Sequence, residues 1–246
     1  DYLPLLIDYE ERFYAAGKIG GSRFVRREGR PSDEAVITAR MIDRSLRPLF
    51  NDAERRDVQV VITVLSFDKE NDPDIISLVA ASLALSLSRI SFAGPVGAVR
   101  LGRVKGELIV NPSYQQRAKS DYDLILAGKG DLITMVEAKG NEVPEADITQ
   151  AFNEGRAFLK QLADFQKEIA KKAGVKKNET MPVESNPALE QFIAHFVKKK
   201  LTESLFKKSD ISVKESLAYL KQEFSDEISK EFGADAQSLA HSLFSF

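Results

Sequence analysis

Residues 57–88, DVQVVITVLSFDKENDPDIISLVAASLALSLS, change from one apolar pattern to another and decide the fold class. Residues 57–67 are β-branched and mostly apolar, which predicts a strand that is covered on both faces. Asp72, Pro73 and Asp74 then predict the start of a helix. Asp72 is the expected N-cap, and Pro73 is expected at the first helical position, where its missing N–H costs nothing. A buried strand followed by a helix predicts mixed α and β structure.

The segments on either side continue the mixture of strands and helices. Leu3 to Tyr9 is strand-like. The Ser32 hydroxyl can accept hydrogen bonds from backbone N–H groups at the start of a helix to about Leu46, and Pro48 stops that helix. Two β-hairpins are predicted downstream; they pair residues 95–103 with 107–111 and residues 123–127 with 132–137.

After Pro144 the apolar residues recur every three or four positions. This spacing predicts one long helix that ends near Gly174. Residues 175–187 are polar and contain two prolines, which predicts a linker, and residues 188–246 are helical throughout. We therefore expect an α+β domain over residues 1–174, followed by the linker and a small all-α helical domain.

The composition of the 246-residue chain excludes several classes of protein. It is 43% apolar and 29% charged with a net charge of −2, as is typical of packed globular proteins. Without cysteine there is no disulfide, Cys-ligated zinc or thiol nucleophile, and two histidines leave little for a His-based metal site or a Ser-His-Asp triad. Residues 75–87, the longest apolar stretch, are shorter than the roughly 20 residues that span a bilayer. We expect a cytoplasmic protein with no membrane partner.

Arginines concentrate in one part of the chain. Between Lys18 and Arg47 there are eight basic and four acidic residues, a local charge of +4, and seven of the eight are arginines. Arginine presents a planar fork of donors that matches phosphate oxygens, whereas lysine would serve for solubility. The choice of residue therefore favours anion recognition.

These arginines fall into a loop and a helix face. In the loop at residues 23–30 an aromatic ring lies among four guanidinium groups, a combination that suits single-stranded nucleic acid because it reads no sequence. In the predicted helix three arginines follow i, i+4 and i+7 spacing and so share one face. The candidate RNA-binding residues are Phe24, Arg26, Arg27, Arg30, Arg40, Arg44 and Arg47.

Other interpretations of the same residues stay open. Arginines at helical spacing usually form a solvated face, here with Asp43 and Glu34 as partners, and a lone Phe24 is more often a core residue. The acidic residues between Asp68 and Asp74 suggest a metal site or paired carboxylates. Asp and Asn ahead of proline are ordinary turn and cap residues, however, and the spacing lacks the Gly and terminal Glu of a calcium loop. We assign this run no catalytic role.

Five motifs in order resemble the bacterial polynucleotide phosphorylase family. They are YEERFYAAGK at 9–18, FVRREGRPS at 24–32, ARMIDRSLRPLF at 39–50, ENDPD at 70–74 and GPVG at 94–97. The match is to the first ribonuclease PH-like domain of that family and to the helical domain that follows it. The resemblance implies an α+β fold of the ribosomal-protein-S5 domain 2-like type.

The resemblance also implies a function. Members of this family form ring-shaped homotrimers that degrade single-stranded RNA from its 3′ end, with inorganic phosphate attacking to release nucleoside diphosphates. The implied setting is messenger-RNA degradation in the cytoplasm, with RNA-degradosome components as further partners. The family's RNA-gripping loop falls on Phe24, Val25, Arg26 and Arg27, with Val25 in place of a second aromatic residue, and its arginines near the RNA path fall on Arg30, Arg40, Arg44 and Arg47.

Several parts of the family's machinery have no counterpart in these 246 residues. The phosphate-binding serine loop and the aspartates that hold catalytic Mg²⁺ belong to a second ribonuclease PH-like copy, which KH and OB-fold modules follow. We therefore expect a fragment that guides RNA and builds the trimer, has no catalytic residues or metal of its own, and is inactive alone. Two alternatives are a non-catalytic RNA-binding or ring-assembly module of an exosome-like complex and a phosphometabolite-binding α+β protein.

Overall fold

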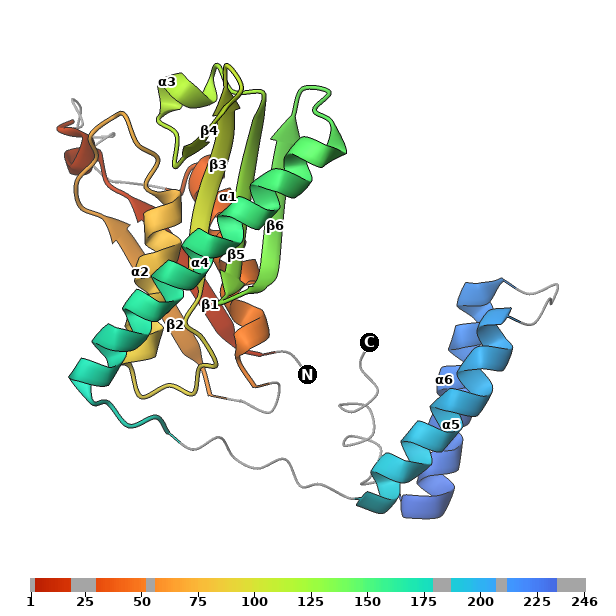
Figure 1. Ribbon diagram of the computed structural model, residues 1–246. Helices are drawn as coiled ribbons and strands as arrows, with labels where there is room; N and C mark the ends of the chain where they lie inside the picture. The colour runs from red at the N-terminus through yellow and green to blue at the C-terminus, as the bar shows by residue number, and fades with distance from the viewer. Residues whose placement is uncertain (1–2, 19–29, 52–55, 179–186, 207–211, 234–246) are drawn as a thin grey trace. The chain divides into compact units, whose positions relative to one another are not determined.

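The computed structural model describes residues 3–18, 30–51, 56–178, 187–206 and 212–233 of the chain. The chain divides into two compact units, residues 2–181 and residues 182–246, and each is described by itself. In its described residues the larger unit contains two β-sheets and the helices α1 to α4, as Figure 1 shows. The smaller unit is helical. This mixture confirms the predicted α+β class.

The first sheet of the larger unit has two parallel strands. β1 (Leu5–Glu11) pairs with β2 (Val58–Val64), and Leu5 lies opposite Val58. Buried and exposed side chains alternate at the start of both strands, and Val61 is 53% exposed. The prediction that residues 57–67 are covered on both faces is therefore wrong, because the described elements cover one face of this sheet.

The helix between these strands begins where the sequence predicts. α1 (Asp33–Leu46) has Ser32 as its N-cap, whose hydroxyl accepts a hydrogen bond from the backbone N–H of Ala35 at 3.0 Å. Asp33 and Glu34 in its first turn complement the helix dipole. The chain then passes through a short 3-10 helix, η2 (Arg47–Leu49), which contains Pro48.

The second helix begins one residue later than the sequence predicts. α2 (Asp74–Leu87) has Pro73, not Asp72, as its N-cap. The Asp72 carboxylate accepts a 3.3 Å hydrogen bond from the backbone N–H of Asp74. Asp72 therefore still binds a backbone N–H at the start of the helix, and its carboxylate also pairs with Arg117.

The second sheet is antiparallel and contains both predicted hairpins. Its strand order is β4 (Glu107–Val110), β3 (Gly97–Val104), β5 (Tyr122–Lys129) and β6 (Leu132–Gly140). Lys105 and Gly106 form the first turn, both with positive φ, as the prediction of a tight hairpin requires. The short helix α3 (Tyr114–Arg117) lies between β4 and β5 in the sequence.

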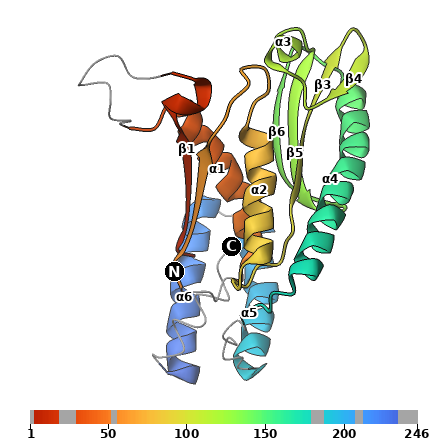
Figure 2. The ribbon, with the colours of Figure 1, turned by 90° about the vertical axis from the view of Figure 1, so that its left-hand side faces the viewer.

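A long helix lies across this sheet, as Figure 2 shows. α4 (Glu145–Ala173) ends at Gly174 in the left-handed conformation, which confirms the predicted stop. One short backbone segment joins three elements: the Val96 N–H donates to the Ser82 hydroxyl of α2 at 2.7 Å, and the Val96 carbonyl accepts from Gln166 of α4 at 2.8 Å. This junction holds α2 and α4 at the start of β3.

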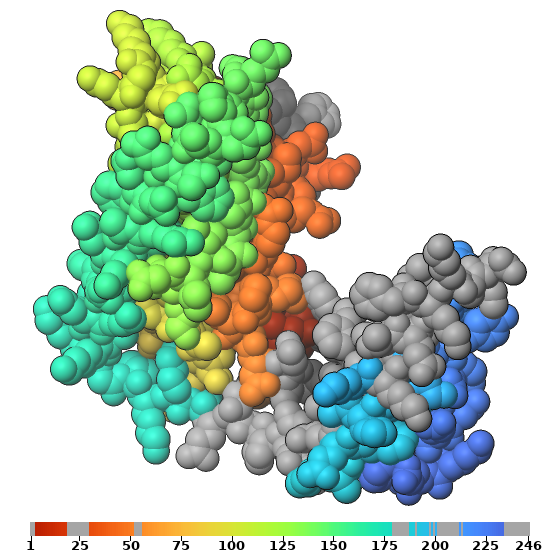
Figure 3. All heavy atoms as spheres, turned by 45° about the vertical axis from the view of Figure 1, so that its right-hand side comes forward, coloured from red at the N-terminus to blue at the C-terminus, as the bar shows by residue number. Residues whose placement is uncertain are grey.

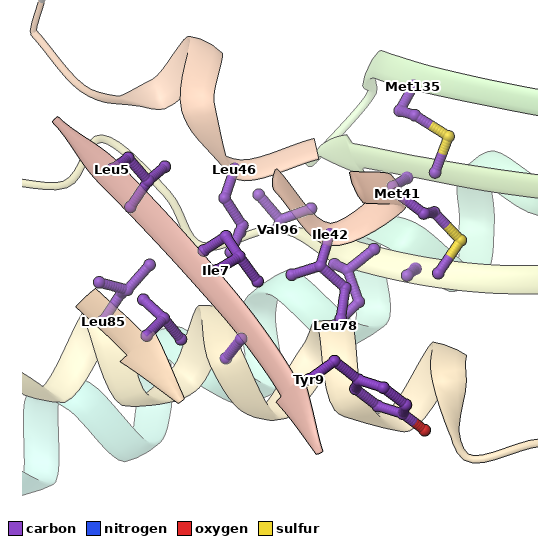
Figure 4. Packing of buried hydrophobic residues seen from close by; sticks show 14 of the residues in the cluster. Leu5, Ile7, Tyr9, Met41, Ile42, Leu46, Leu78, Leu85, Val96 and Met135 are labelled. Atoms are coloured by element: carbon purple, nitrogen blue, oxygen red, sulfur yellow. The ribbon is translucent and has the colours of Figure 1, made fainter. Parts of the chain in front are cut away.

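Two clusters of buried apolar side chains make up the core of the larger unit. The first fills the space between β1, α1 and α2, where Figure 4 shows Leu5, Ile7 and Tyr9 of β1 beside Ile42, Leu46, Leu78 and Leu85. The second lies between α4 and the outer face of the second sheet and includes Leu101, Leu124, Leu126 and Leu159. α1 belongs to the first cluster, which buries one of its faces and leaves the opposite face for solvent or a ligand.

The smaller unit contains two described helices. α5 (Pro187–Phe206) and α6 (Val213–Phe232) pack through their own apolar cluster, which includes Leu189, Phe196 and Phe224. A capping box between Ser212 and Glu215 begins α6. Helices are found where the sequence predicts an all-α module; residues 179–186 of the predicted linker lie outside the described residues.

Candidate nucleic-acid interface

The exposed face of α1 carries two of the candidate arginines. Arg40 and Arg44 are both exposed, while Met41, Ile42 and Leu46 of the same helix are buried. Figure 3 shows α1, in orange, at the surface next to the green strands of the second sheet. The spacing argument therefore places these two guanidinium groups together on an accessible surface.

Arg44 has one partner at this surface. Its guanidinium donates to Glu137 of β6 at 2.9 Å, and the two side chains are 57% and 46% exposed. An ion pair exposed to this extent contributes between zero and about 1 kcal/mol. A phosphate can therefore replace the Glu137 carboxylate as the partner of Arg44 at little cost.

Arg47 lies in a different environment, although its spacing suggested the same face. Its guanidinium binds both carboxylate oxygens of Asp43 and also donates to the backbone carbonyls of Leu3 and Leu5 at 2.9 and 3.0 Å. These bonds attach the end of α1 to the start of β1. Arg47 has a structural role in this unit, and its contact with RNA stays a prediction.

Arg30 lies beside the cap of α1 and lines a cleft of about 1130 Å³. The cleft also reaches Ser32 and the ends of β1 and β2, together with α3 and the start of β5. Its aromatic lining comes from Tyr9, Phe13, Phe67, Tyr114 and Tyr122. The candidate residues Phe24, Arg26 and Arg27 lie outside the described residues, so Arg30 is the described member of the predicted loop.

A network of ion pairs forms the floor of this cleft: Asp72, Arg117 and Asp123 line it, and the buried Arg100 joins Asp123 to Asp74 behind them. Arg100 of β3 is 4% exposed and binds Asp74 on one side and Asp123, at 3.0 Å, on the other. Arg117 of α3 binds Asp72 at 2.7 Å and Asp123 at 2.9 Å. Two arginines thus bind three aspartates from the start of α2 and from β5, which leaves one negative charge in excess.

The network changes the electrostatics at the start of α2. A helix N-terminus ordinarily attracts anions such as phosphate. Here the carboxylates of Asp72 and Asp74 occupy that position, and arginines neutralise them. The arginines at the floor of the cleft are therefore already bound to carboxylates, whereas Arg40 on α1 is exposed.

Burial and negative charge shift the titration of the groups around this floor. Burial, with added repulsion from Asp72, raises the pKa of Tyr114 to about 12. Burial and the nearby carboxylates raise the pKa of Tyr9 as well. Burial also raises the pKa of Asp74, and the positive charge of Arg100 opposes that rise. Both tyrosines stay neutral near pH 7.

The sequence interpretation missed this network. It treated the acidic residues from Asp68 to Asp74 as turn and cap residues, and that holds for Asp68, which accepts from the backbone N–H groups of Glu70 and Asn71 at 2.8 Å. Asp72 and Asp74 instead pair with arginines that come much later in the chain. The available signal was Arg100, a single charge inside the apolar strand pattern of residues 97–101.

Two general properties of the described residues bear on function. No group of three or more His, Asp or Glu side chains within the described ranges is arranged to hold a metal ion, and we assign no metal ligand in this chain. No helix in the same ranges is long and apolar enough to cross a membrane.

Comparison with known families gives two matches on the larger unit. The 3′ exoribonuclease family, domain 1, matches residues 1–91, and domain 2 of the same family matches residues 94–157. The boundary between the two matches falls at the turn after α2, just before the Val96 junction.

Individual proteins agree with these family matches. The chain is 45% identical to the polyribonucleotide nucleotidyltransferase of Heliobacterium modesticaldum over 235 residues, which are 92% of this chain and 33% of the relative. It is 45% identical over 205 residues to the enzyme of the same name from Roseiflexus castenholzii, covering 83% and 27% of the two chains. The chain thus spans about a third of the length of these relatives. The crystal structure of rice Rrp46 also matches, with a TM-score of 0.54 and 13% sequence identity. The match spans 68% of this chain and 73% of the Rrp46 chain, and it shows that the two share a fold.

Proposed function

The chain belongs to the 3′ exoribonuclease family, and we propose that it is the RNA-guiding portion of a polyribonucleotide nucleotidyltransferase. In the proposed reaction of the longer enzyme, inorganic phosphate attacks the 3′-terminal phosphodiester of single-stranded RNA and releases a nucleoside diphosphate. The contribution of this chain is to bind the RNA backbone. We further propose that the longer enzyme is a cytoplasmic homotrimer that uses Mg²⁺, acts in messenger-RNA degradation and associates with degradosome components.

The single observation that carries this proposal is the exposed basic face of α1. Arg40 and Arg44 are exposed on α1, whose opposite face packs into the apolar core. At the end of the helix, Arg47 binds the backbone carbonyl of Leu3. A rigid support keeps the two guanidinium groups in fixed positions, so less conformational entropy is lost when a phosphate binds. Arg30 at the start of the same helix extends this basic surface towards the predicted loop.

The basic face of α1 predicts a measurable loss of RNA affinity. Replacing Arg40 and Arg44 together with alanine should weaken binding of a fluorescent oligouridylate by about tenfold. It should also reduce the slope of log K against log salt by about 1.4, because each lost phosphate contact on a single strand contributes about 0.7. Titration by fluorescence anisotropy at several salt concentrations measures both quantities.

A control variant distinguishes RNA binding by α1 itself from a general effect of positive charge on the protein. Lys160 and Lys167 are exposed on α4 and carry the same total charge as the α1 pair. Their replacement with alanine should leave affinity and salt slope close to those of the native chain. Equal weakening by the two double variants would refute a specific role for α1.

The matched ion pairs under the cleft predict that this chain has no phosphorolytic activity alone. Incubated with RNA and inorganic phosphate, the 246-residue polypeptide should release no nucleoside diphosphate above a blank, because the described cationic groups at the cleft floor are bound to carboxylates. Chromatographic detection of nucleoside diphosphates checks this. Clear release by the native chain that is absent from an Arg26→Ala/Arg27→Ala variant would contradict the prediction.

A further inference from the structure

The side of β6 that faces α1 changes from apolar to charged along the strand. Met135, Glu137 and Lys139 are two residues apart, so they point to the same face of the sheet. Met135 is buried in the same apolar cluster as Met41 of α1, and Figure 4 shows both side chains. Glu137 and Lys139 are exposed and continue this face beyond the core. The end of β6 therefore presents one acidic and one basic side chain beside α1.

Lys139 borders the same cleft as the start of α1. It lines that cleft together with Arg30, Glu34 and Thr38. Within the part of the chain that the structure describes, its ammonium group forms no ion pair. An exposed ammonium group without a carboxylate partner can bind a phosphate, and no existing ion pair has to break first.

Glu137 occupies one of the two exposed arginines of α1. Its carboxylate lies 2.9 Å from the guanidinium of Arg44 and joins β6 to α1 across 93 positions of the sequence. Carboxylate and phosphate oxygens bind a guanidinium in the same way, through its fork of N–H donors. Glu137 and an RNA phosphate are therefore alternative partners of Arg44.

We propose that β6 forms the second side of an RNA track that consists of Arg30, Arg40, Arg44 and Lys139. In this track Lys139 binds a backbone phosphate, and Glu137 is a built-in competitor that a phosphate displaces from Arg44. The inference rests on the proposed function and extends it from α1 to β6. Contacts with phosphates alone carry no sequence information, so the track accepts any single strand. The competitor limits the affinity, which lets the strand move along the surface.

Removal of the competitor should strengthen RNA binding. Glu137→Gln keeps the size of the side chain and removes its charge. It should raise the affinity for a fluorescent oligouridylate by about two- to fivefold, since an exposed ion pair is weak. Fluorescence anisotropy measures the change. The matched control is Glu107→Gln, at an exposed position on β4 at the opposite edge of the same sheet, which should leave the affinity unchanged.

A double-variant cycle separates competition for Arg44 from general repulsion between the carboxylate and RNA. Competition requires the guanidinium, so Glu137→Gln should have little effect in a chain that also carries Arg44→Ala. General repulsion would give the same gain in both chains. An equal gain in the two chains, or no gain in the native chain, would overturn the role of Glu137.

Lys139→Ala tests the phosphate contact on β6. This variant should weaken oligouridylate binding by about threefold and lower the slope of log K against log salt by about 0.7, the value for one contact on a single strand. Lys129→Ala is the control, because Lys129 is exposed at the other end of the β5–β6 hairpin. Equal behaviour of the two lysine variants would overturn the role of Lys139.

Failure of this inference differs from failure of the proposed function. A native 246-residue chain that does not bind oligouridylate would overturn both. If the native chain binds and the Arg40→Ala/Arg44→Ala chain binds less, while the β6 variants behave as their controls do, the RNA contact is confined to α1 and only the role of β6 is refuted. Melting temperatures close to that of the native chain, expected for exposed positions, confirm that each variant is folded.

Discussion

Replacing Arg100 with alanine is expected to lower the free energy of unfolding of the larger unit by about 3–5 kcal/mol, the usual cost of removing one partner from a buried ion pair. Arg100 is 4% exposed, and it bridges Asp74 of α2 and Asp123 of β5. Without the guanidinium, the Asp74 carboxylate stays buried with no opposite charge in contact. Denaturant titration of the native and variant chains measures the difference.

Two further variants decide whether charge is the cause of this loss. Arg44→Ala removes an exposed arginine from an ion pair and should change the free energy of unfolding by less than about 1 kcal/mol. Arg100→Met combined with Asp74→Leu removes both charges and should recover much of the stability lost in Arg100→Ala, because no unpaired ion is left. A double variant as unstable as the single one would contradict the ion-pair explanation and point to packing instead.

The features that sequence predicted well are local ones. Ser32 caps α1 through a bond to a residue three positions away, and the turn at Lys105 and Gly106 depends on two neighbouring backbone conformations. Gly174 ends α4 for the same kind of reason. Each of these signals is contained within a few consecutive residues, so the chain around it is sufficient to interpret it.

Features that depend on distant segments were missed. Asp72 and Asp74 resemble cap residues because the preference for aspartate near a helix start is real, yet their charges pair with Arg100 and Arg117. Likewise, the apolar composition of residues 57–67 predicts burial, whereas Val61 faces away from the described core. Local composition shows that a residue suits burial but not which element covers it.

Among the candidate RNA-binding residues, too, local spacing predicted some environments correctly and missed one. Helical spacing correctly placed Arg40 and Arg44 on one accessible face of α1. The same spacing put Arg47 with them, and the backbone of Arg47 is still helical, but its guanidinium binds Asp43 and the carbonyls of Leu3 and Leu5. Helical spacing gives the direction in which a side chain leaves the helix, but not the partners from distant segments that a long side chain such as arginine reaches.

A second large loss of stability is expected from Gly97→Ala, at the start of β3. A β-carbon at Gly97 would lie 2.5 Å from the backbone oxygen and 2.9 Å from the Cα of Leu159 in α4. Because these are backbone atoms, no side-chain rotation can relieve the overlap, and the helix has to move away from the sheet. The adjacent bond between Gln166 and the Val96 carbonyl opposes that movement. We expect a loss of about 1–3 kcal/mol, as for other overpacked cores.

Gly155→Ala is the matched control, because Gly155 lies on α4 and faces side chains of the second sheet, not backbone atoms. A β-carbon at Gly155 of α4 meets the ends of the Leu126 and Leu101 side chains, at 2.6 and 3.0 Å, and these can rotate. Alanine also favours the helix by about 1 kcal/mol over glycine, so the net change in unfolding free energy should be small. If Gly155→Ala destabilised the unit as much as Gly97→Ala, side-chain crowding would account for both. A loss confined to Gly97→Ala would show that α4 is positioned by direct contact between its backbone and β3.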